Sequence, residues 1–362
     1  MTLAFWRDHV KREDILSTTC SQHTFTTQSK VFWIMLVILS PAKKLSFTIQ
    51  RNLKPTIPEF IEQAENIVTS TLSKYSTSKL RTTLNVSNNL ATLNSQRYTN
   101  FLVGTSRPIK HEDEISACSI TAYAGRAWTG LDQKSLSDSE LNYCNKTLRI
   151  ISGLYGLLKP SDIIQPYRLD MGTKVSISTA HYSLGTDMLL SIETSKNLYT
   201  YWNDSLKNSL VAEKPKLIIN VASGEYWKAC LEKELLESNI PVLTVAFREG
   251  SGNSARVISV HAKLARGLFV RFMCQKQPKN VEELQDFDGD GRGYKFNSSL
   301  SNDDLMVFCR SSSGSSSSSS SSGKKKKAPA KKKVAAAKKT KVSSKKREAP
   351  TKGTRSSKRN KR

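Results

Sequence analysis

The chain has 362 residues and a net charge of +25, with 56 Lys and Arg against 31 Asp and Glu. Nineteen of these bases and one acid, Glu348, lie between Lys324 and Arg362, which gives this segment a charge of +18 and leaves +7 for the other 323 residues. The body is therefore mildly basic, and a histone-like polycation is excluded as a description of the whole chain. The longest apolar run, Val31–Leu39, has nine residues, whereas a membrane-spanning helix needs about 20, so we expect no membrane protein.

The composition divides the chain into four parts. Residues 1–34 are a polar N-terminal extension without an early apolar signal region, and Met35 could serve as an alternative start. Residues 35–310 hold nearly all of the apolar pattern and form the predicted domain. Residues 311–322 are serine apart from Gly314, which predicts a flexible linker. Residues 323–362 are rich in Lys, Ala and Ser and are predicted to be a disordered basic tail, because like charges repel and few apolar groups oppose them.

The cysteines and histidines are scattered, which favours an intracellular protein with reduced, mostly buried thiols. The sequence has no CxxC pair and no HExxH motif, so it predicts neither a metal site nor a cofactor. The cysteines are Cys20, Cys118, Cys144, Cys230, Cys274 and Cys309.

The predicted domain alternates helix and strand patterns. In chain order, apolar spacing predicts a strand at 35–39, helices at 60–72, 137–148 and 198–210, a strand at 217–221, a helix at 226–236, strands at 242–247 and 257–260, and a helix at 263–275. Ser137 and Glu140 add a capping box to the second helix. Such mixing predicts an α/β or α+β fold, with a sheet enclosed by helices.

Two segments that follow predicted strands could form an anion-binding pocket. Ser40–Lys44 turns at a proline after the first strand and presents lysines; its other interpretation is a solvated turn. Asn220–Tyr226 follows a strand and begins a helix, where Ser223 would either face a polar pocket or cap the helix.

A third segment, Leu148–Gly172, contains the glycine turn Gly153–Gly156 after a helix. Glycines let backbone N–H groups approach a phosphate, as in helix-hairpin-helix modules that bind DNA without reading bases. The Gly-x-x-Gly spacing departs from the usual Gly-x-Gly, and Pro160 would cut a second helix short. The turn therefore predicts either a phosphate contact or a plain tight turn.

The fourth segment is the helix predicted at Lys263–Gln275. Its apolar side chains share one face, and Lys263, Arg266 and Arg271 lie on the other. This pattern is typical of a helix that faces phosphate and equally of an ordinary solvated helix.

The segment Asp286–Asn297 resembles a calcium-binding EF-hand loop at positions 1, 3, 5 and 6. Its twelfth residue is Asn297 instead of the bidentate Glu that such a loop needs, so we interpret it as an acidic turn. Tyr294 and Phe296 alternate in the way of a strand that leaves the turn.

Seven short motifs follow one another along the predicted domain. They are Met35–Lys43, Tyr123–Leu131, Ser152–Pro160, Gln165–Gly172, Leu198–Asp204, Ile219–Tyr226 and Lys263–Phe272. In this order they resemble the YaaA family of peroxide-stress proteins over about residues 35–310. Each motif alone is weakly diagnostic, whereas seven in sequence order are specific. The chain departs from the family pattern at Trp128, where members usually carry Tyr, and at Asp170, where they usually carry Glu.

The resemblance implies a single compact α+β domain, with a curved mixed β-sheet wrapped by helices. It also implies a role in the response to hydrogen peroxide, by limiting available intracellular iron and so the Fenton damage to DNA. It further implies DNA binding through a basic cleft and a helix-hairpin-helix-like element, which we place at Leu141–Lys159. The sequence offers no Glu-x-x-His pair and no cysteine cluster, so the control of iron is expected to be indirect.

Three classes of function remain open. The leading one is a non-enzymatic, DNA-binding protective protein. The second is an enzyme that acts on nucleic acid or a nucleotide, and the third is a chromatin-associated protein that acts through its tail. The DNA-contacting candidates are Gly153, Gly156, Lys159, Arg168, Lys263, Arg266 and Arg271, and the pocket candidates are Lys43, Arg168, Asp170, Asn220 and Glu225.

The expected partners follow from charge. DNA would bind mostly through sequence-independent phosphate contacts. The basic runs of the tail are of the kind that nuclear import receptors read. We therefore expect a cytosolic protein with a nuclear pool.

Overall fold

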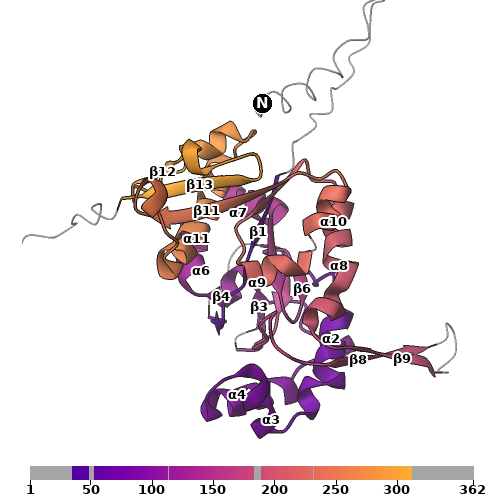
Figure 1. The fold of residues 1–362 in the computed structure, drawn as a ribbon. Coiled ribbons are helices and arrows are strands. Elements are labelled where there is room, and N and C mark those ends of the chain that lie inside the picture. Colours follow the sequence, from indigo (N-terminus) through magenta and orange to yellow (C-terminus); the bar gives the residue numbers. More distant parts are fainter. Residues whose placement is uncertain (1–34, 49–52, 113, 183–188, 231, 312–362) are drawn as a thin grey trace, which may run out of the picture. The chain divides into compact units, whose positions relative to one another are not determined.

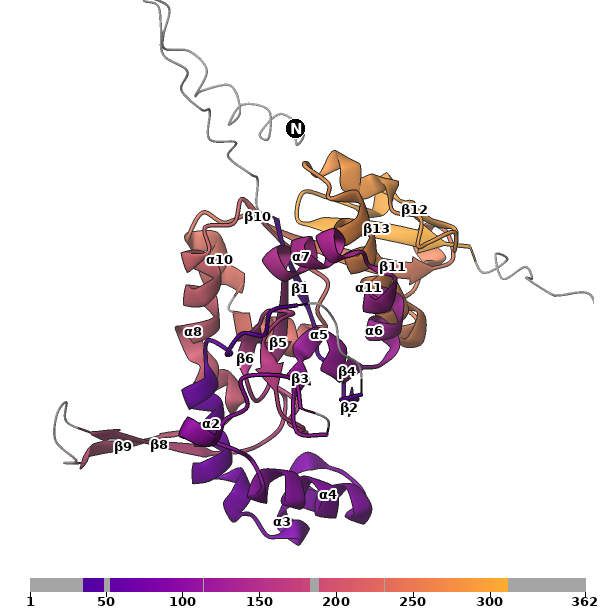
Figure 2. The same cartoon turned by 180° about the vertical axis from the view of Figure 1, so that it is seen from behind.

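The computed structural model describes residues 35–48, 53–112, 114–182, 189–230 and 232–311 (Figures 1 and 2). The predicted N-terminal extension, most of the serine linker and the basic tail lie outside these residues. All described residues belong to one compact unit. None of the helices in this part of the chain is long and apolar enough to cross a membrane.

A seven-stranded sheet forms the centre of the domain, in the order β12-β13-β11-β10-β1-β5-β6. Its strands are β1 (Met35–Leu39), β5 (Leu148–Ser152), β6 (Gly156–Leu158), β10 (Leu217–Asn220), β11 (Val242–Glu249), β12 (Tyr294–Phe296) and β13 (Leu305–Arg310). The five strands from β13 to β5 run parallel, and β12 and β6 add antiparallel edges. Every residue of β1, β5 and β10 is buried, as expected where a parallel sheet is covered on both faces.

Helices and short strand pairs surround this sheet. The helices are α2 (Ile61–Ser70), α3 (Thr77–Leu84), α4 (Asn88–Thr99), α5 (Ser119–Ala122), α6 (Arg126–Leu131), α7 (Asp138–Thr147), α8 (Leu198–Ala212), α9 (Gly224–Trp227), α10 (Glu232–Glu237) and α11 (Ser259–Lys276). The pairs are β2 (Lys44–Leu45) with β4 (Tyr123–Ala124), β3 (Ala117–Cys118) with β7 (Ile163–Ile164), and β8 (Ile177–Tyr182) with β9 (Leu189–Ser195). Figures 1 and 2 show α8 and α10 on one flank of β1, and α6 and α11 on the other.

The fold is thus a mixed α/β domain with a mostly parallel sheet, which corrects the expected α+β class. The mixed sheet and its helical cover are confirmed. Parallel strands need long crossover connections, and the segments between β1, β5, β10 and β11 supply them with helices. A pattern of buried runs could not separate the two classes, since it does not give strand direction.

Several local predictions are confirmed. The first strand begins and ends as predicted, at Met35 and Leu39. The capping box is present: the Glu140 N–H donates to the Ser137 hydroxyl, and the Ser137 N–H donates to the Glu140 carboxylate at 2.7 Å. The strand predicted at 257–260 is wrong, because Ile258 is the N-cap of α11 and the chain is helical from Ser259.

The helix-hairpin-helix-like element expected at Leu141–Lys159 is wrong as well. Helix α7 passes directly into β5, which turns back through residues 153–155 into β6. The residues after α7 are Leu, Arg, Ile and Ile, and the two β-branched isoleucines suit a buried strand between two neighbours. Pairing with β1 and β6 decides the structure here.

Helices α6 and α11 approach each other backbone to backbone at two glycines. A Cβ atom on Gly267 of α11 would lie 1.7 Å from the carbonyl oxygen of Ala127, and one on Gly130 of α6 would lie 2.3 Å from that of Leu264. No side chain fits between the helices at this crossing, so the two glycines set the distance between them.

The buried carboxyl of Asp162 makes stability depend on pH. Its side chain is 3% exposed and accepts hydrogen bonds from the Thr56 hydroxyl at 2.6 Å and the Lys159 N–H at 2.7 Å. Burial raises the pKa of Asp162 from 3.8 to about 6. A raised folded-state pKa contributes stability that is present at low pH and is lost as the pH rises through that value.

We therefore expect the wild type to lose stability, relative to the Asp162→Asn variant, as the pH rises from about 4 to 7. Urea unfolding of both proteins at four pH values in this range measures the difference in free energy of unfolding. The comparison cancels the groups that titrate in both proteins. A difference that stays constant over the range would contradict the raised pKa.

Candidate functional site

Two loops meet where the order of the parallel strands reverses. The chain runs from β1 to β5 on one side, and β10, β11 and β13 lie on the other side of β1. Ser40 follows β1 and Ser223 follows β10. The Ser223 N–H donates to the Ser40 hydroxyl at 2.9 Å, and the two hydroxyls lie 3.3 Å apart. Ligands of open α/β sheets bind at this edge, outside the carboxyl ends of the strands at the switch point.

A cluster around Asp170 lies at this edge. We call Lys43, Arg168, Asp170 and Tyr226 the Asp170 cluster. The Lys43 ammonium lies 2.9 Å and the Arg168 guanidinium 3.6 Å from one carboxylate oxygen, and the Tyr226 hydroxyl donates to the other at 3.4 Å. Burial raises the pKa of Tyr226, and the neighbouring carboxylate raises it further, so the phenol stays a donor.

Two contacts hold the loop that carries Arg168 and Asp170: one with Tyr98 and one with the glycine turn at 153–156. The Tyr98 hydroxyl donates to the carbonyl of Arg168 at 2.5 Å. A Cβ atom on Gly153 would lie 2.4 Å from the carbonyl oxygen of Leu169, so only glycine lets the loop settle there. This contact places Asp170 over the end of β5.

The glycines of that turn do not face a phosphate. Gly153 and Gly156 are both buried. Gly156 has a φ of 69°, and a Cβ atom there would meet the Trp202 ring at 2.9 Å. The structure shows a packing role for Gly153 and Gly156, which favours the plain tight turn over the phosphate contact. Lys159 is exposed three residues later, and its N–H donates to the buried carboxyl of Asp162.

The structure separates the two pocket candidates at and after the end of β10, Asn220 and Glu225. The Asn220 side chain is 4% exposed; it accepts from the Ala222 N–H at 2.9 Å and donates to the Thr244 hydroxyl at 3.2 Å. Asn220 thus holds the strand end and does not join the Asp170 cluster. Glu225 is exposed and accepts the Gly172 N–H at 3.0 Å, which brings it beside the loop of Asp170.

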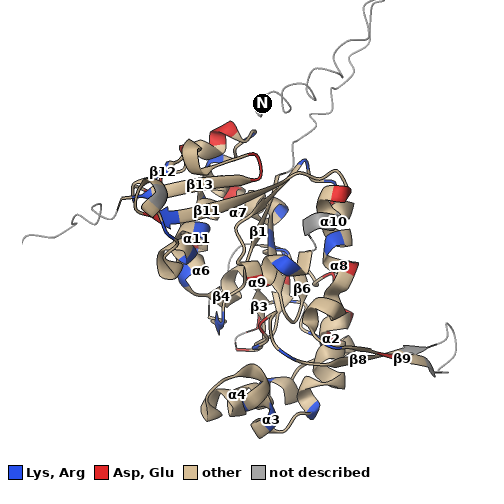
Figure 3. Ribbon diagram, viewed as in Figure 1, with Lys and Arg blue, Asp and Glu red and all other residues tan. Residues whose placement is uncertain are grey.

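The predicted helix at 263–275 is confirmed as part of α11, which is drawn in Figure 3 with Lys and Arg in blue. Its three cations differ in environment. Lys263 is exposed. Arg266 is half-buried, and this desolvation lowers its pKa. Arg271 is 13% exposed and pairs with Asp290 at 2.5 Å and Asp132 at 3.7 Å. These two carboxylates disfavour the phosphate contact that we expected of Arg271, because an incoming phosphate would have to displace them.

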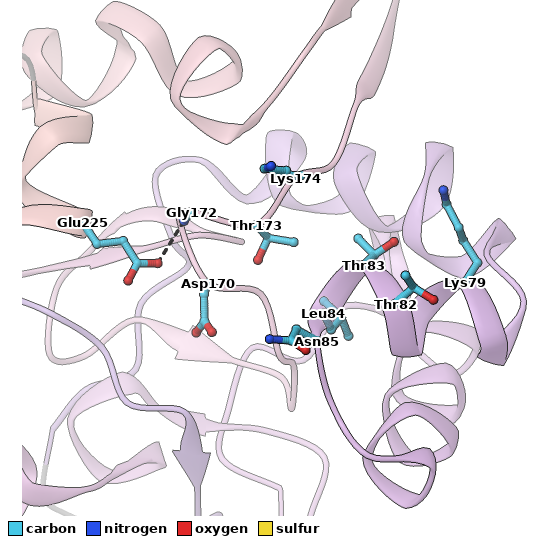
Figure 4. Close-up of a pocket in the computed structure, with 10 residues that line it drawn as sticks. All are labelled: Lys79, Thr82, Thr83, Leu84, Asn85, Asp170, Gly172, Thr173, Lys174 and Glu225. Carbon is cyan, nitrogen blue, oxygen red and sulfur yellow. Dashed lines mark hydrogen bonds between the residues drawn. The ribbon is translucent and has the colours of Figure 1, made fainter.

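An open pocket of about 650 Å³ lies beside the Asp170 cluster (Figure 4). One wall is the loop with Asp170, Gly172, Thr173 and Lys174, together with Glu225. The opposite wall is α3 and the residue after it, with side chains that include Lys79, Thr82 and Asn85. Figure 4 shows the Asn85 amide pointing across the pocket toward the Asp170 carboxylate.

The wall of the pocket that α3 supplies was not predicted. Helices α3 and α4 are joined by the three residues 85–87, and we call this pair the α3–α4 hairpin. Asn85 ends α3 in the left-handed conformation with φ 49°, and the Ser87 hydroxyl caps α4 by accepting the Leu90 N–H. Asn followed by Ser two residues later is a turn and N-cap signal, and it could have located the hairpin.

Comparison with known proteins assigns the family. The sequence model of the family described as "Peroxide stress protein YaaA" matches residues 35–300. The chain belongs to this family. It is similar to a UPF0246 protein of Idiomarina loihiensis, 36% identical over 282 residues, which are 76% of this chain and 99% of the relative. UPF0246 proteins of Paraburkholderia phytofirmans (34% over 283 residues) and Clostridium botulinum Eklund 17B (36% over 281 residues) cover 76% of this chain and 98% of their own length.

In this YaaA-family domain the acidic segment at 286–297 forms a closed turn. The two carboxylate oxygens of Asp288 accept the Asp290 and Gly291 N–H groups, and Asp290 pairs with Arg271 and Arg292. Asn297 accepts the Leu300 N–H. The strand predicted from Tyr294 and Phe296 is confirmed as β12.

Calcium should therefore leave this turn unchanged. The carboxylates of Asp288 and Asp290 already accept backbone and guanidinium donors. A loop without Glu at its twelfth position binds calcium no better than about millimolar. We expect the same melting temperature with micromolar calcium and with a chelator. A rise at micromolar calcium that Asp288→Ala abolishes would show that the loop is a sensor.

None of the cysteines in the described residues forms a disulfide. Cys118, Cys144, Cys230 and Cys274 are buried and Cys309 is partly exposed, which confirms the expected burial. Cys20 lies outside the described residues. Within the described ranges no group of three or more His, Cys, Asp or Glu could hold a metal ion.

Proposed function

We propose that this YaaA-family chain is a DNA-binding protein of the response to hydrogen peroxide, and that it protects DNA by limiting available intracellular iron without catalysing a reaction. Membership of the family supports the peroxide role. Control of iron would be indirect, since the described residues offer no cluster of metal ligands.

The observation that carries DNA binding is a run of cations on adjoining elements, three of them exposed and one, Arg266, half-buried. Lys44 lies on β2 opposite Ala124 of β4, and Arg126 follows two residues later at the start of α6. Helix α6 packs on α11, which carries Lys263 and Arg266. Among the described residues none of these four has a carboxylate within ion-pair distance. Unpaired cations on adjoining elements suit the repeated phosphates of a duplex.

The α3–α4 hairpin supports the same proposal from the far wall of the pocket. Lys79 and Arg81 are exposed on α3. The first turn of α4 presents backbone N–H groups, and amides at a helix start attract phosphate. We propose that this hairpin, in place of the segment at 141–159, performs the phosphate-binding role of a helix-hairpin-helix element.

The enzyme alternative has less support. It needs Lys43, Asp170 and Asn220 within hydrogen-bond reach in a closed pocket. Lys43 pairs with Asp170, but the side chain of Asn220 bonds elsewhere and the pocket is open. We therefore treat the pocket as a binding site.

The tail is proposed to be an electrostatic tether and a nuclear address, read by an import receptor. Basic runs of this kind also bind any polyanion. The nuclear address is tested in cells by comparing the full chain with a chain that ends at Ser311. If the two chains distribute identically between nucleus and cytosol, the tail is not a nuclear address.

The direct test titrates both chains against duplex and branched DNA at several salt concentrations. We expect the shorter chain to bind, with the logarithm of its affinity falling by about 0.9 per phosphate contact for each tenfold rise in salt. Absence of binding by the shorter chain at low salt would confine DNA binding to the tail. The chelatable iron pool of peroxide-treated cells, measured with and without the protein, tests the proposed effect on iron; an unchanged pool would contradict it.

A further inference from the structure

The pocket beside the Asp170 cluster has a chemistry that DNA backbone binding does not require. Eight of its ten lining residues carry polar or charged side chains, the other two being Leu84 and Gly172, and none of the ten is aromatic. A site for a nucleobase would need flat apolar or aromatic surfaces for stacking. The lining therefore favours a ligand with many hydroxyl groups.

Hydroxyl recognition is available at the centre of the pocket. Asp170 and Glu225 supply carboxylates, and Glu225 uses one oxygen for the Gly172 N–H. Thr173 supplies a hydroxyl, and the Asn85 amide points toward Asp170 (Figure 4). Carboxylates accept hydrogen bonds from sugar hydroxyls, as the acidic residue of dinucleotide sites does from ribose.

Phosphate recognition is available at the rim. Lys79 and Lys174 line the pocket from opposite walls, and both are exposed. Neither has a carboxylate within ion-pair distance among the described residues, so their ammonium groups are available to an anion. Lys43, which lies nearer to Asp170 than Arg168 does, is already paired with that carboxylate at 2.9 Å.

We propose that this pocket binds a phosphorylated sugar. Asp170 and Glu225 accept its hydroxyls, and Lys79 and Lys174 hold its phosphate. The position of Asp170 and Glu225 at the switch point of the sheet, where α/β proteins bind ligands, supports the same site. The inference goes beyond DNA binding and does not depend on it.

Two sources share this chemistry: a free sugar phosphate and the 5′-phosphorylated end of a nucleic acid strand. Calorimetry of the full chain with ribose 5-phosphate, ribose and inorganic phosphate tests the site. We expect ribose 5-phosphate to bind at least about tenfold more tightly than either part alone. Equal affinity for ribose 5-phosphate and phosphate would overturn the proposal.

Three single variants locate the site. Lys174→Ala should weaken ribose 5-phosphate and phosphate about tenfold each, because it removes a charge that holds the phosphate. Asp170→Asn should weaken ribose 5-phosphate about tenfold without weakening phosphate, because it removes a hydroxyl acceptor and leaves Lys79 and Lys174 in place. The melting temperature is a check on folding. The matched control is Lys295→Ala, which removes an exposed lysine of β12. It shows how much of the anion binding comes from surface lysines and from the tail. Wild-type affinity in both pocket variants would overturn the proposal.

Competition by oligonucleotides separates the two sources. If a 5′-phosphorylated strand displaces ribose 5-phosphate more than tenfold better than the same strand without the phosphate, the natural ligand is a strand end. If both strands compete equally while ribose 5-phosphate binds as expected, it is a free sugar phosphate. Either result supports the proposal that the pocket binds a phosphorylated sugar. The salt titration with duplex DNA tests the proposed function separately.

Discussion

Gly267→Ala should prevent the domain from folding. The added Cβ atom would lie 1.7 Å from the carbonyl oxygen of Ala127, 2.6 Å from its carbon and 2.7 Å from the backbone nitrogen of Leu131. All three atoms belong to the backbone of α6, so no side chain can turn away, and the helices must separate. Separation would expose apolar side chains of α11, among them Leu268 and Phe269, which are buried.

The expected loss exceeds about 4 kcal/mol, which is a large part of the roughly 5–15 kcal/mol that stabilises a domain. Circular dichroism and soluble yield of the expressed chain measure it. Gly224→Ala is the matched control, because a Cβ atom there meets nothing within 4 Å. We expect its stability to stay within about 0.5 kcal/mol of the wild type. A Gly267→Ala protein that melts near the wild-type temperature would show that α6 and α11 can move apart at little cost.

Replacing Lys44, Arg126 and Lys263 together by alanine should strongly reduce DNA binding by the chain that ends at Ser311. If each contacts one phosphate, the slope of log affinity against log salt should become less negative by about 2.7, at about 0.9 per contact. Near 0.1 M salt the same relation gives a loss of about tenfold for each contact. The loss should be alike for all DNA sequences, because phosphate contacts carry no sequence information.

The control removes three exposed lysines from other places: Lys276 and Lys279 at and beyond the last turn of α11, and Lys295 on β12. Its net charge changes by the same amount, so a general effect of charge would lower binding equally in both variants. Fluorescence anisotropy at four salt concentrations gives both affinities and slopes. If the slope of log affinity against log salt is the same in the two variants, DNA does not bind at the proposed interface.

Local sequence signals predicted the elements of the fold well and the site only in part. The capping box and the buried run at 35–39 depend on neighbouring residues, and both are confirmed. Lys43, Arg168 and Asp170 come together because they follow or cover strand ends, which a motif at a strand end indicates.

The failures concern contacts between distant segments. No local sequence signal near Arg271 indicates its ion pair with Asp290, 19 residues further along the chain. A helix pattern does not distinguish a paired arginine from a free one. The turn at 153–156 has the glycines of a phosphate loop, but the ring of Trp202 and the carbonyl of Leu169 occupy the space around it. The pocket wall supplied by Lys79 and Asn85 was missed because α3 approaches the Asp170 loop only in the folded domain.

The close crossing of α6 and α11 also bears on the entropy of recognition. Two helices in backbone contact cannot shift past each other by rotating side chains, so their relative position is fixed before any ligand arrives. Arg126 and Lys263 then project from a single rigid body, and a partner need not freeze one helix against the other when it binds. The conformational entropy lost on binding is then limited to that of the lysine and arginine side chains. Such a surface should distinguish nucleic acids by the geometry of their phosphates, because it cannot reshape itself to follow each one.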